Sequence, residues 1–322
     1  MSTHVFAALV TAQGIAANNR GLNEGNTTTL QKLIWNEQVH TTVSAESIRF
    51  ALRRRLAESG PCNRTYEDDT RLNSWKDPKF SGWSNSNGDV YVDDDLLGFM
   101  IAEAGRSEGG DAAEEGKGAA EEAATGKKAK QPKGTATVRR AVLELTRAVS
   151  LTPWSGDVTF NAASPGATPS AQKKGSNPVP YATEMHATRY QYGMALTPGR
   201  LRKAERAQVA LRGLCALGEV AGNHGRFLFD FSPESVVFRI TDDPAPRLLF
   251  SFEMRDGQPA IPSLIQKVRA GDILAKELVI GGAVVTGLTS EERAALSGAK
   301  LFDGVRAACD QACQNIPSQA RL

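Results

Sequence analysis

The chain has 322 residues, of which 41% are hydrophobic, enough to bury the core of one large domain or of two ordinary ones. Lys and Arg number 38 against 36 Asp and Glu, and the formal net charge of +2 argues against a protein that coats nucleic acid through overall charge alone. No apolar run reaches the roughly 18 residues of a membrane span and the first residues lack a basic leader, so we expect a cytoplasmic protein with no membrane contact. Four scattered cysteines give no disulfide framework.

Strand and helix patterns alternate along the chain. The apolar run 4–11 predicts a buried strand. Ser44 is a suitable N-cap for a helix that ends near residue 59, with Ile48, Leu52 and Leu56 as its apolar stripe. Further strands are predicted at 137–150 (a helix being the alternative), 183–196, 235–240 and 247–253, and further helices at 201–220, 262–277 and 290–313.

Two segments interrupt this pattern. Residues 104–134 contain no aromatic, Ile, Leu or Val side chain, so this low-complexity stretch is predicted to be a mobile surface excursion. Residues 155–181, rich in Gly, Pro, Ser, Ala and Asn, indicate a long loop or a hairpin. Without these two segments the order is strand, helix, strand, strand, helix, strand. That is the order of a ferredoxin-like or RNA-recognition-motif sheet, which belongs to the α+β class.

Catalytic and cofactor motifs are missing from the sequence. It contains neither the G-x-S-x-G elbow of hydrolases nor a complete phosphate-binding loop. Cys309 and Cys313 are four residues apart on a predicted helix, but no second ligand pair accompanies them, so core packing is the better interpretation. The acidic runs 67–69 and 93–95 are interpreted as solvated turns. We therefore expect no metal and no cofactor.

Basic residues gather in two other segments. Arg49 and Arg53 lie one turn apart on the first helix and are followed by Arg54 and Arg55, which together make a local positive patch that fits phosphate binding. A solvated arginine-rich face is the alternative and, for this helix taken alone, the more common explanation. The preceding loop is rich in Gly and Asn and contains Arg20, a composition that fits either a phosphate contact or a structural turn.

A second basic segment runs from 189 to 212. Its arginines and lysine interleave with Tyr190 and Tyr192, a pairing found where bases stack and phosphates are bound, although core packing of the two rings is the alternative. Beyond it, glycines flank Asn223, His224 and Arg226, and the Phe227, Phe229 and Phe231 that follow are interpreted as core residues.

Four ordered segments resemble one family, the backbone subunits of type I CRISPR surveillance complexes (Cascade), in their DevR-type, type I-B-like branch. They are NRGLNEGNTTTLQKL at 19–33, VSAESIRFALRRRL at 43–56, TEMHATRYQYGMAL at 183–196 and GNHGRFLFDFSPESVVFRI at 222–240. Together they cover most of the predicted sheet and both of its first helices.

The resemblance implies a right-hand architecture. It implies an RNA-recognition-motif-like (ferredoxin-like) palm at 1–59 and 136–322, a long fingers insertion at 60–135 that contains 104–134, and a thumb hairpin at 155–182 within the palm. It also implies an RNA-binding set, which consists of Asn19, Arg20, Asn26, Ser44, Ser47, Arg49, Arg53, Arg54, Asn223, His224 and Arg226.

The same resemblance implies the partners. They are a CRISPR guide RNA, target DNA reached through the guide, further copies of the chain in a filament, and other Cascade subunits, in antiviral defence or transposon targeting. Related type III subunits cut RNA with an aspartate in the first loop, where this chain has only Glu24 and Glu37, so we expect no nuclease activity. A metal-dependent ribonuclease and a DNA-binding regulator are the alternatives, and no helix-turn-helix pattern supports the latter. The acids are expected to lie in the fingers, away from the arginines.

Overall fold

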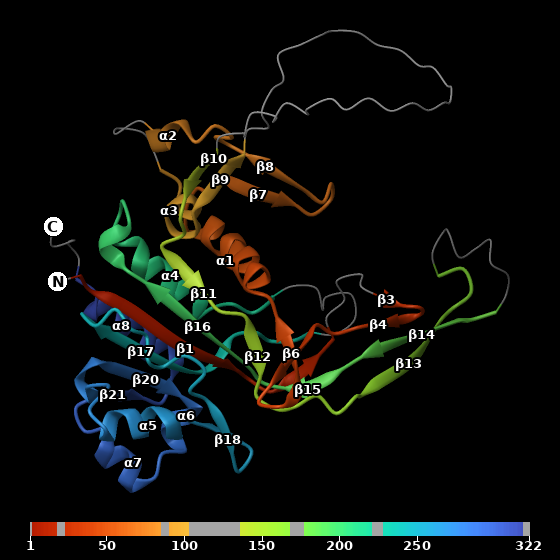
Figure 1. Ribbon diagram of the computed structural model, residues 1–322. Coiled ribbons are helices and arrows are strands. Elements are labelled where there is room, and N and C mark those ends of the chain that lie inside the picture. The colour runs from red at the N-terminus through yellow and green to blue at the C-terminus, as the bar shows by residue number, and fades with distance from the viewer. Residues whose placement is uncertain are drawn as a thin grey trace, which may run out of the picture.

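The computed structural model describes residues 2–17, 23–84, 90–102, 136–167, 177–220 and 228–317. Within these ranges the largest element is a nine-stranded sheet in the order β21-β20-β17-β1-β16-β12-β6-β5, with β11 also paired to β16 (Figure 1). Its strands are β1 His4–Thr11, β5 Lys32–Trp35, β6 Gln38–Val43, β11 Leu143–Leu145, β12 Ala148–Ser150, β16 Tyr190–Leu196, β17 Pro233–Thr241, β20 Leu278–Gly282 and β21 Lys300–Phe302.

The predicted first strand, β1, lies at the centre of this sheet. It pairs antiparallel with both β16 and β17. The helices α1 Ala45–Ser59 and α4 Arg206–Leu214 fall in the chain between β1 and β11 and between β16 and β17. The order strand, helix, strand, strand, helix, strand is therefore present, and β11 and β12 together form its second strand position.

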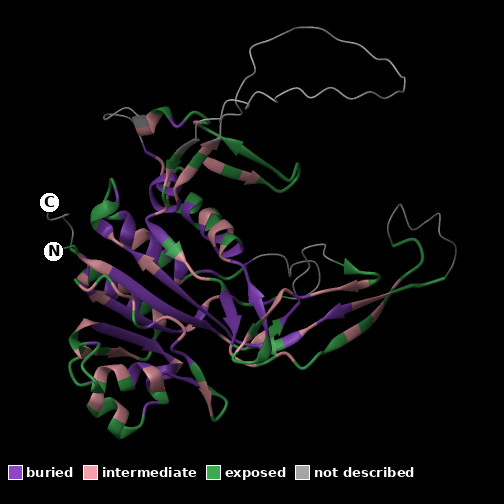
Figure 2. Cartoon of the chain, viewed as in Figure 1, coloured by how far each residue is buried: buried purple, intermediate pink, exposed green. Residues whose placement is uncertain are grey.

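Helices cover both faces of the sheet. Val5, Ala7 and Leu9 of β1 belong to the same apolar cluster as residues of α1, α4 and α8 Val305–Asn315. Phe6, Ala8 and Val10 belong to a second cluster with residues of α5 Pro262–Arg269, α6 Ala283–Thr286 and α7 Ser290–Ala295 and their flanks. Because both faces are covered, β1 is buried along almost its whole length and reads as a continuous apolar run, and most residues of its neighbours β16 and β17 are buried as well (Figure 2).

Two smaller units project from the sheet (Figure 1). The first follows α1 and consists of β7 Arg64–Glu67, β8 Leu72–Trp75, α2 Ser81–Ser84, α3 Val92–Leu97, β9 Phe99–Ala102 and β10 Ala136–Arg139. The second is a four-stranded sheet of β13 Val158–Ala163, β14 Val179–Glu184, β4 Thr27–Thr28 and β3 Asn23–Glu24. Shorter elements are β2 Gly14–Ala16 with β15 His186–Thr188, β18 Glu253–Arg255 with β19 Gln258–Ala260, and the 3-10 turns η2 Pro198–Arg200 and η3 Ala275–Glu277.

Several predicted elements are wrong in extent. The helix expected at 262–277 ends at Arg269 with α5, and the strand expected at 137–150 is divided into β10, β11 and β12. The helix expected at 201–220 is only α4, because the backbone N–H groups of Arg202 and Lys203 donate to the Asp95 carboxylate and hold a non-helical turn. The strand expected at 247–253 forms only from residue 253, since Arg247 and Phe250 adopt positive φ. The helix expected at 290–313 divides into α7, β21 and α8, and Gly298 adopts a φ of 100° in the break.

Candidate nucleic-acid interface

The first helix, α1, is fixed at its start and along one face. The Ser44 hydroxyl accepts a hydrogen bond from the Ser47 backbone N–H at 3.3 Å, and the two hydroxyl oxygens lie 3.0 Å apart. Ile48, Leu52 and Leu56 are buried in the core, as the sequence predicts. Both serines are themselves buried. The arginines of α1 therefore extend from a helix whose position is set by packing and by its N-cap.

These arginines contact the unit that follows α1. The Arg49 guanidinium donates to the Leu97 carbonyl oxygen, and Arg53 Nε lies 3.3 Å from an Asp93 carboxylate oxygen. Burial and, second to it, the nearby positive charge of Arg64 lower the pKa of Arg53 to about 10, against the opposing effect of Asp93. A pKa near 10 leaves Arg53 charged at neutral pH, so this half-buried flank of α1 is positive.

The acidic run 93–95 is not a solvated turn, which corrects the sequence-based interpretation. Asp93, Asp94 and Asp95 are only 2%, 5% and 0% exposed. Asp95 lies 2.8 Å from the Arg206 guanidinium of α4. Asp93 also accepts backbone hydrogen bonds from Asn63 and Arg64, which stabilise a carboxylate away from water.

The expected separation of acids from arginines is also wrong. Asp93 and Asp95 each form an ion pair with an arginine of the helices that cover the sheet. At the surface, Arg54 of α1 pairs with Asp68 at 3.1 Å. The expectation failed because the carboxylates of the insertion dock it against α1 and α4, so these charges face one another.

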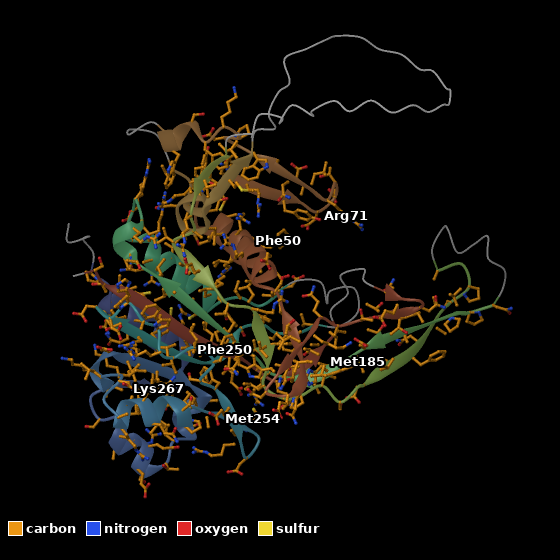
Figure 3. All side chains as sticks on the ribbon, in the orientation of Figure 1. Phe50, Arg71, Met185, Phe250, Met254 and Lys267 are labelled. Atoms are coloured by element: carbon orange, nitrogen blue, oxygen red, sulfur yellow. The ribbon has the colours of Figure 1, made fainter. Side chains whose placement is uncertain are left out.

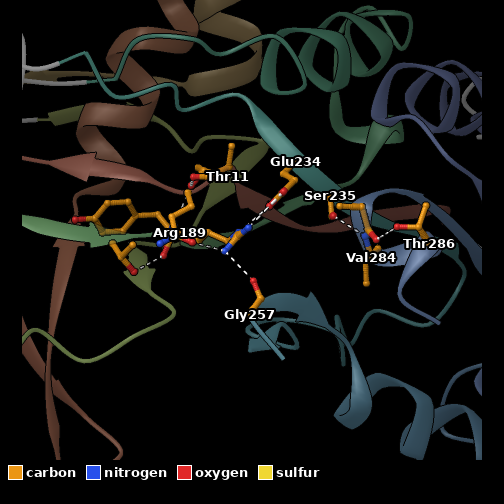
Figure 4. Close-up of polar contacts among 12 residues, drawn as sticks. Thr11, Arg189, Glu234, Ser235, Gly257, Val284 and Thr286 are labelled. Atoms are coloured by element: carbon orange, nitrogen blue, oxygen red, sulfur yellow. Dashed lines mark hydrogen bonds and ion pairs between the residues drawn. The ribbon is translucent and has the colours of Figure 1, made fainter. Parts of the chain in front are cut away.

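The second basic segment is divided between core and surface: Arg189, Arg206 and the two tyrosines are buried, whereas its remaining basic residues are exposed, namely Arg200, Arg202, Lys203 and Arg212. Arg189 is buried, and its guanidinium contacts Glu234 at 2.7 Å, Gln13 and the Gly257 carbonyl oxygen (Figure 4). Tyr190 and Tyr192 are each 1% exposed, and both rings pack against Phe231. The aromatic rings are thus core residues and cannot stack on bases, which decides between the two interpretations.

The remaining predicted RNA-binding residues lie in loops. Asn26 is exposed between β3 and β4, and its carbonyl oxygen accepts from the Ala182 N–H at 3.0 Å, which joins this turn to β14. Asn19, Arg20, Asn223, His224 and Arg226 lie outside the described residues. Phe229 and Phe231 are buried, which confirms that they belong to the core, whereas Phe227 lies outside the described residues.

A cleft between α1 and the β7–β8 hairpin was not predicted. Arg53 and Arg54 line it from the helix, and Arg64, Tyr66 and Asn73 line it from the hairpin. We refer to it as the α1–hairpin cleft. Residues 64–67 lie near the basic helix in sequence, but no sequence pattern places their side chains against it, since that depends on how the hairpin folds back.

Metal-binding geometry is not found in the described part of the chain, where no group of three His, Cys, Asp or Glu side chains is arranged to hold an ion. Glu24 and Glu37 are both exposed, on β3 and in the turn between β5 and β6. Cys309 and Cys313 are buried free thiols of α8. Among the described helices none is long and apolar enough to cross a membrane.

Comparison with known proteins identifies the family. No protein-family model matches the chain. It is 65% identical over 319 residues, 98% of both sequences, to the CRISPR-associated protein Cas7/Cst2/DevR of Myxococcus xanthus (strain DK1622). The chain belongs to the Cas7/Cst2/DevR family. The resemblance seen in the four sequence segments is thereby confirmed.

Solved structures agree in fold with this Cas7/Cst2/DevR family member. A chain of a CRISPR RNA-guided surveillance complex superposes with a TM-score of 0.53 at 16% identity, over 97% of this chain and 98% of the other. A chain of a CRISPR RNA-guided surveillance complex in a pre-nicking state gives 0.54 at 12% identity, over 98% and 100%. The mixed α and β fold of the family member is therefore shared along its whole length.

Proposed function

We propose that the protein is a non-catalytic guide-RNA-binding backbone subunit of a CRISPR surveillance complex. The observation that carries this proposal is the 65% identity to a Cas7/Cst2/DevR protein over nearly the whole chain. The subunit oligomerises along CRISPR RNA and presents it for pairing with target DNA, so sequence choice is delegated to base pairing. Its partners are the guide, the target reached through it, further copies of the chain and the other Cascade subunits. We place this activity in the cytoplasm, in antiviral defence or transposon targeting.

The architecture fits a right hand. The palm is an RNA-recognition-motif-like core formed by 1–59 and 136–322, in which β17, β1, β16 and the β11–β12 pair lie side by side. The fingers are the insertion 60–135, and the thumb is 155–182, where β13 and β14 form an antiparallel pair. This division is supported by the two units that project from different ends of the sheet (Figure 1).

The guide-binding set follows from the sequence motifs and from the placement of α1. Arg49, Arg53 and Arg54 supply positive charge along one flank of that helix. Ser44 and Ser47 act by fixing the start of α1, where the Ser44 side chain caps the helix. The loop residues of the set (Asn19, Arg20, Asn26, Asn223, His224 and Arg226) complete the contact with guide phosphates.

The test begins with the nucleic acid that copurifies with the full-length chain. Extraction and sequencing are expected to give RNA of discrete guide length with a shared repeat. The double variant Arg49→Glu/Arg53→Glu is expected to lose RNA at low salt, because it reverses two charges on α1. A matched control reverses the exposed Arg140 and Arg306 instead and is expected to retain RNA. Wild-type protein that binds no RNA at low salt, or an α1 variant that binds as wild type does, would refute the proposal.

A further inference from the structure

The α1–hairpin cleft is a well-formed concavity with walls from two different units. Its volume is about 170 Å³, several times the roughly 30 Å³ that one water molecule occupies in the liquid. Phe50 lies on the flank of α1 that faces the hairpin (Figure 3), and its ring packs edge-on against Tyr66 at 5.1 Å between centroids. The cleft is therefore braced by an aromatic contact between helix and hairpin.

Positive charge in this cleft exceeds the negative charge available to it. Arg53 has a side chain only 12% exposed; its Nε lies 3.3 Å from the Asp93 carboxylate, and the positive charge of Arg64 is nearby. Within the described residues, Nη1 of Arg53 and Nε of Arg64 are buried and form no hydrogen bond. Buried donors without acceptors are costly, so the cleft favours a ligand that brings anionic oxygen atoms.

The other residues that line the cleft determine which kind of anionic ligand it favours. Tyr66 and Phe50 present apolar ring surface, and Thr65 and Asn73 add polar groups at the rim on the hairpin side. Guanidinium groups beside aromatic rings are a combination that binds single-stranded nucleic acid. The arginines bind the phosphate, and the base or ribose packs against a ring. An acidic peptide would satisfy the arginines but would add no contact to the ring surface that Tyr66 and Phe50 present to the cleft.

We propose that the α1–hairpin cleft is a nucleotide subsite for single-stranded RNA, with one phosphate on Arg53 and Arg64 and the attached nucleoside against Tyr66. This inference rests on the proposed RNA-binding function and extends it to the hairpin, from which no sequence motif assigns an RNA contact. A strand bound in this way lies between α1 and the β7–β8 hairpin and is contacted from both sides.

Two variants of the hairpin test the subsite in the full-length chain. Arg64→Gln removes one cation of the cleft, and Arg71→Gln removes one from the exposed turn of the same hairpin as a matched control. Binding of a single-stranded oligouridylate RNA is titrated over a series of salt concentrations. Arg64→Gln is expected to weaken binding about tenfold and to reduce the salt slope by about 0.7, the value for one phosphate contact on a single strand. Arg71→Gln is expected to bind as wild type does.

The second variant, Tyr66→Ala, separates base contact from charge. It is expected to weaken RNA binding about tenfold with no change in salt slope, and to have no effect on an RNA of the same length with abasic sites. If RNA binds wild type and responds to Arg49→Glu/Arg53→Glu but not to Arg64→Gln or Tyr66→Ala, the subsite is refuted while the proposed function stands. A loss on Arg64→Gln of binding to an oligoglutamate peptide, with RNA binding unchanged, would also overturn the inference, in favour of an acidic protein partner.

Discussion

Asp94 gives the sharpest test of the internal electrostatics, because its carboxyl group is buried beside another acid. It accepts a hydrogen bond from the Asn63 side chain at 2.9 Å. Burial and, second to it, the adjacent charge of Asp93 raise the pKa of Asp94 to about 7, while Asn63 and Arg53 oppose the shift. The folded protein thus prefers the neutral carboxyl, and Asp94→Asn supplies a permanently neutral group of the same shape.

The magnitude follows from the pKa shift. Since the folded pKa lies above the unfolded one, the contribution of the protonated carboxyl is fully present below about pH 4 and is lost as pH rises through about 7. At 1.36 kcal/mol per pKa unit the full shift corresponds to about 4 kcal/mol, and relaxation of the folded protein around the buried carboxylate reduces it to about 2 kcal/mol. Asp94→Asn is therefore expected to stabilise the fold by about 2 kcal/mol at pH 8 and by almost nothing at pH 4.

Urea unfolding at pH 4, 6 and 8 measures this difference, and thermal unfolding is expected to show a rise of about 4 °C in Tm at pH 8. Asp69→Asn is the control, because it makes the same chemical change at an exposed position of the β7–β8 turn. Asp94→Asn that destabilised the protein at pH 8, or that gave the same stability change at pH 4 as at pH 8, would refute the reasoning.

Three further outcomes are expected. Asp95→Ala should lower the free energy of unfolding by about 3–5 kcal/mol in a urea titration, because it leaves the buried Arg206 without its carboxylate. Gly282→Ala should reduce Tm markedly in a thermal melt, since Gly282 has a φ of 95° and an added Cβ would lie 2.0 Å from the Glu234 carbonyl oxygen. Incubation with Mg²⁺ and target RNA should give no cleavage products on a denaturing gel, and Glu24→Ala should leave that result unchanged. Regularly spaced products that disappear in Glu24→Ala would contradict it.

The parts of the fold that sequence predicted are those whose local pattern and packing agree. β1 is an apolar run because helices cover both of its faces, and α1 carries a capping serine and a stripe every four residues, so both were located closely. For the helix expected at 290–313, the local sequence pattern and the packing in the fold do not agree. Its apolar residues divide between the two clusters, with Leu296 in one and Cys309 in the other, and β21 lies between them.

The acidic residues mark the limit of prediction from sequence for the candidate site. A run such as Asp93–Asp95 has the composition of a solvated turn, and only the folded chain shows that Asn63, Arg64 and Arg206 surround it. A carboxylate can be buried only where hydrogen-bond donors from other segments surround it, and the spacing of residues in the sequence does not show where those donors will lie. The same holds for the α1–hairpin cleft, whose two walls meet through the contact of Phe50 with Tyr66.

In the folded chain, many of the opposite charges that give the near-neutral net charge lie in contact with one another. Asp93 and Asp95 neutralise arginines that hold the insertion against α1 and α4, so those arginines contribute to docking as well as to surface charge. The positive charge left over is local, and it lies where Arg53, which pairs with Asp93, has the positive charge of Arg64 nearby. Because that carboxylate belongs to the insertion, the position of the insertion sets how strongly α1 attracts an anion. Docking of the insertion and attraction of an anion to α1 are thus two results of the same few charges.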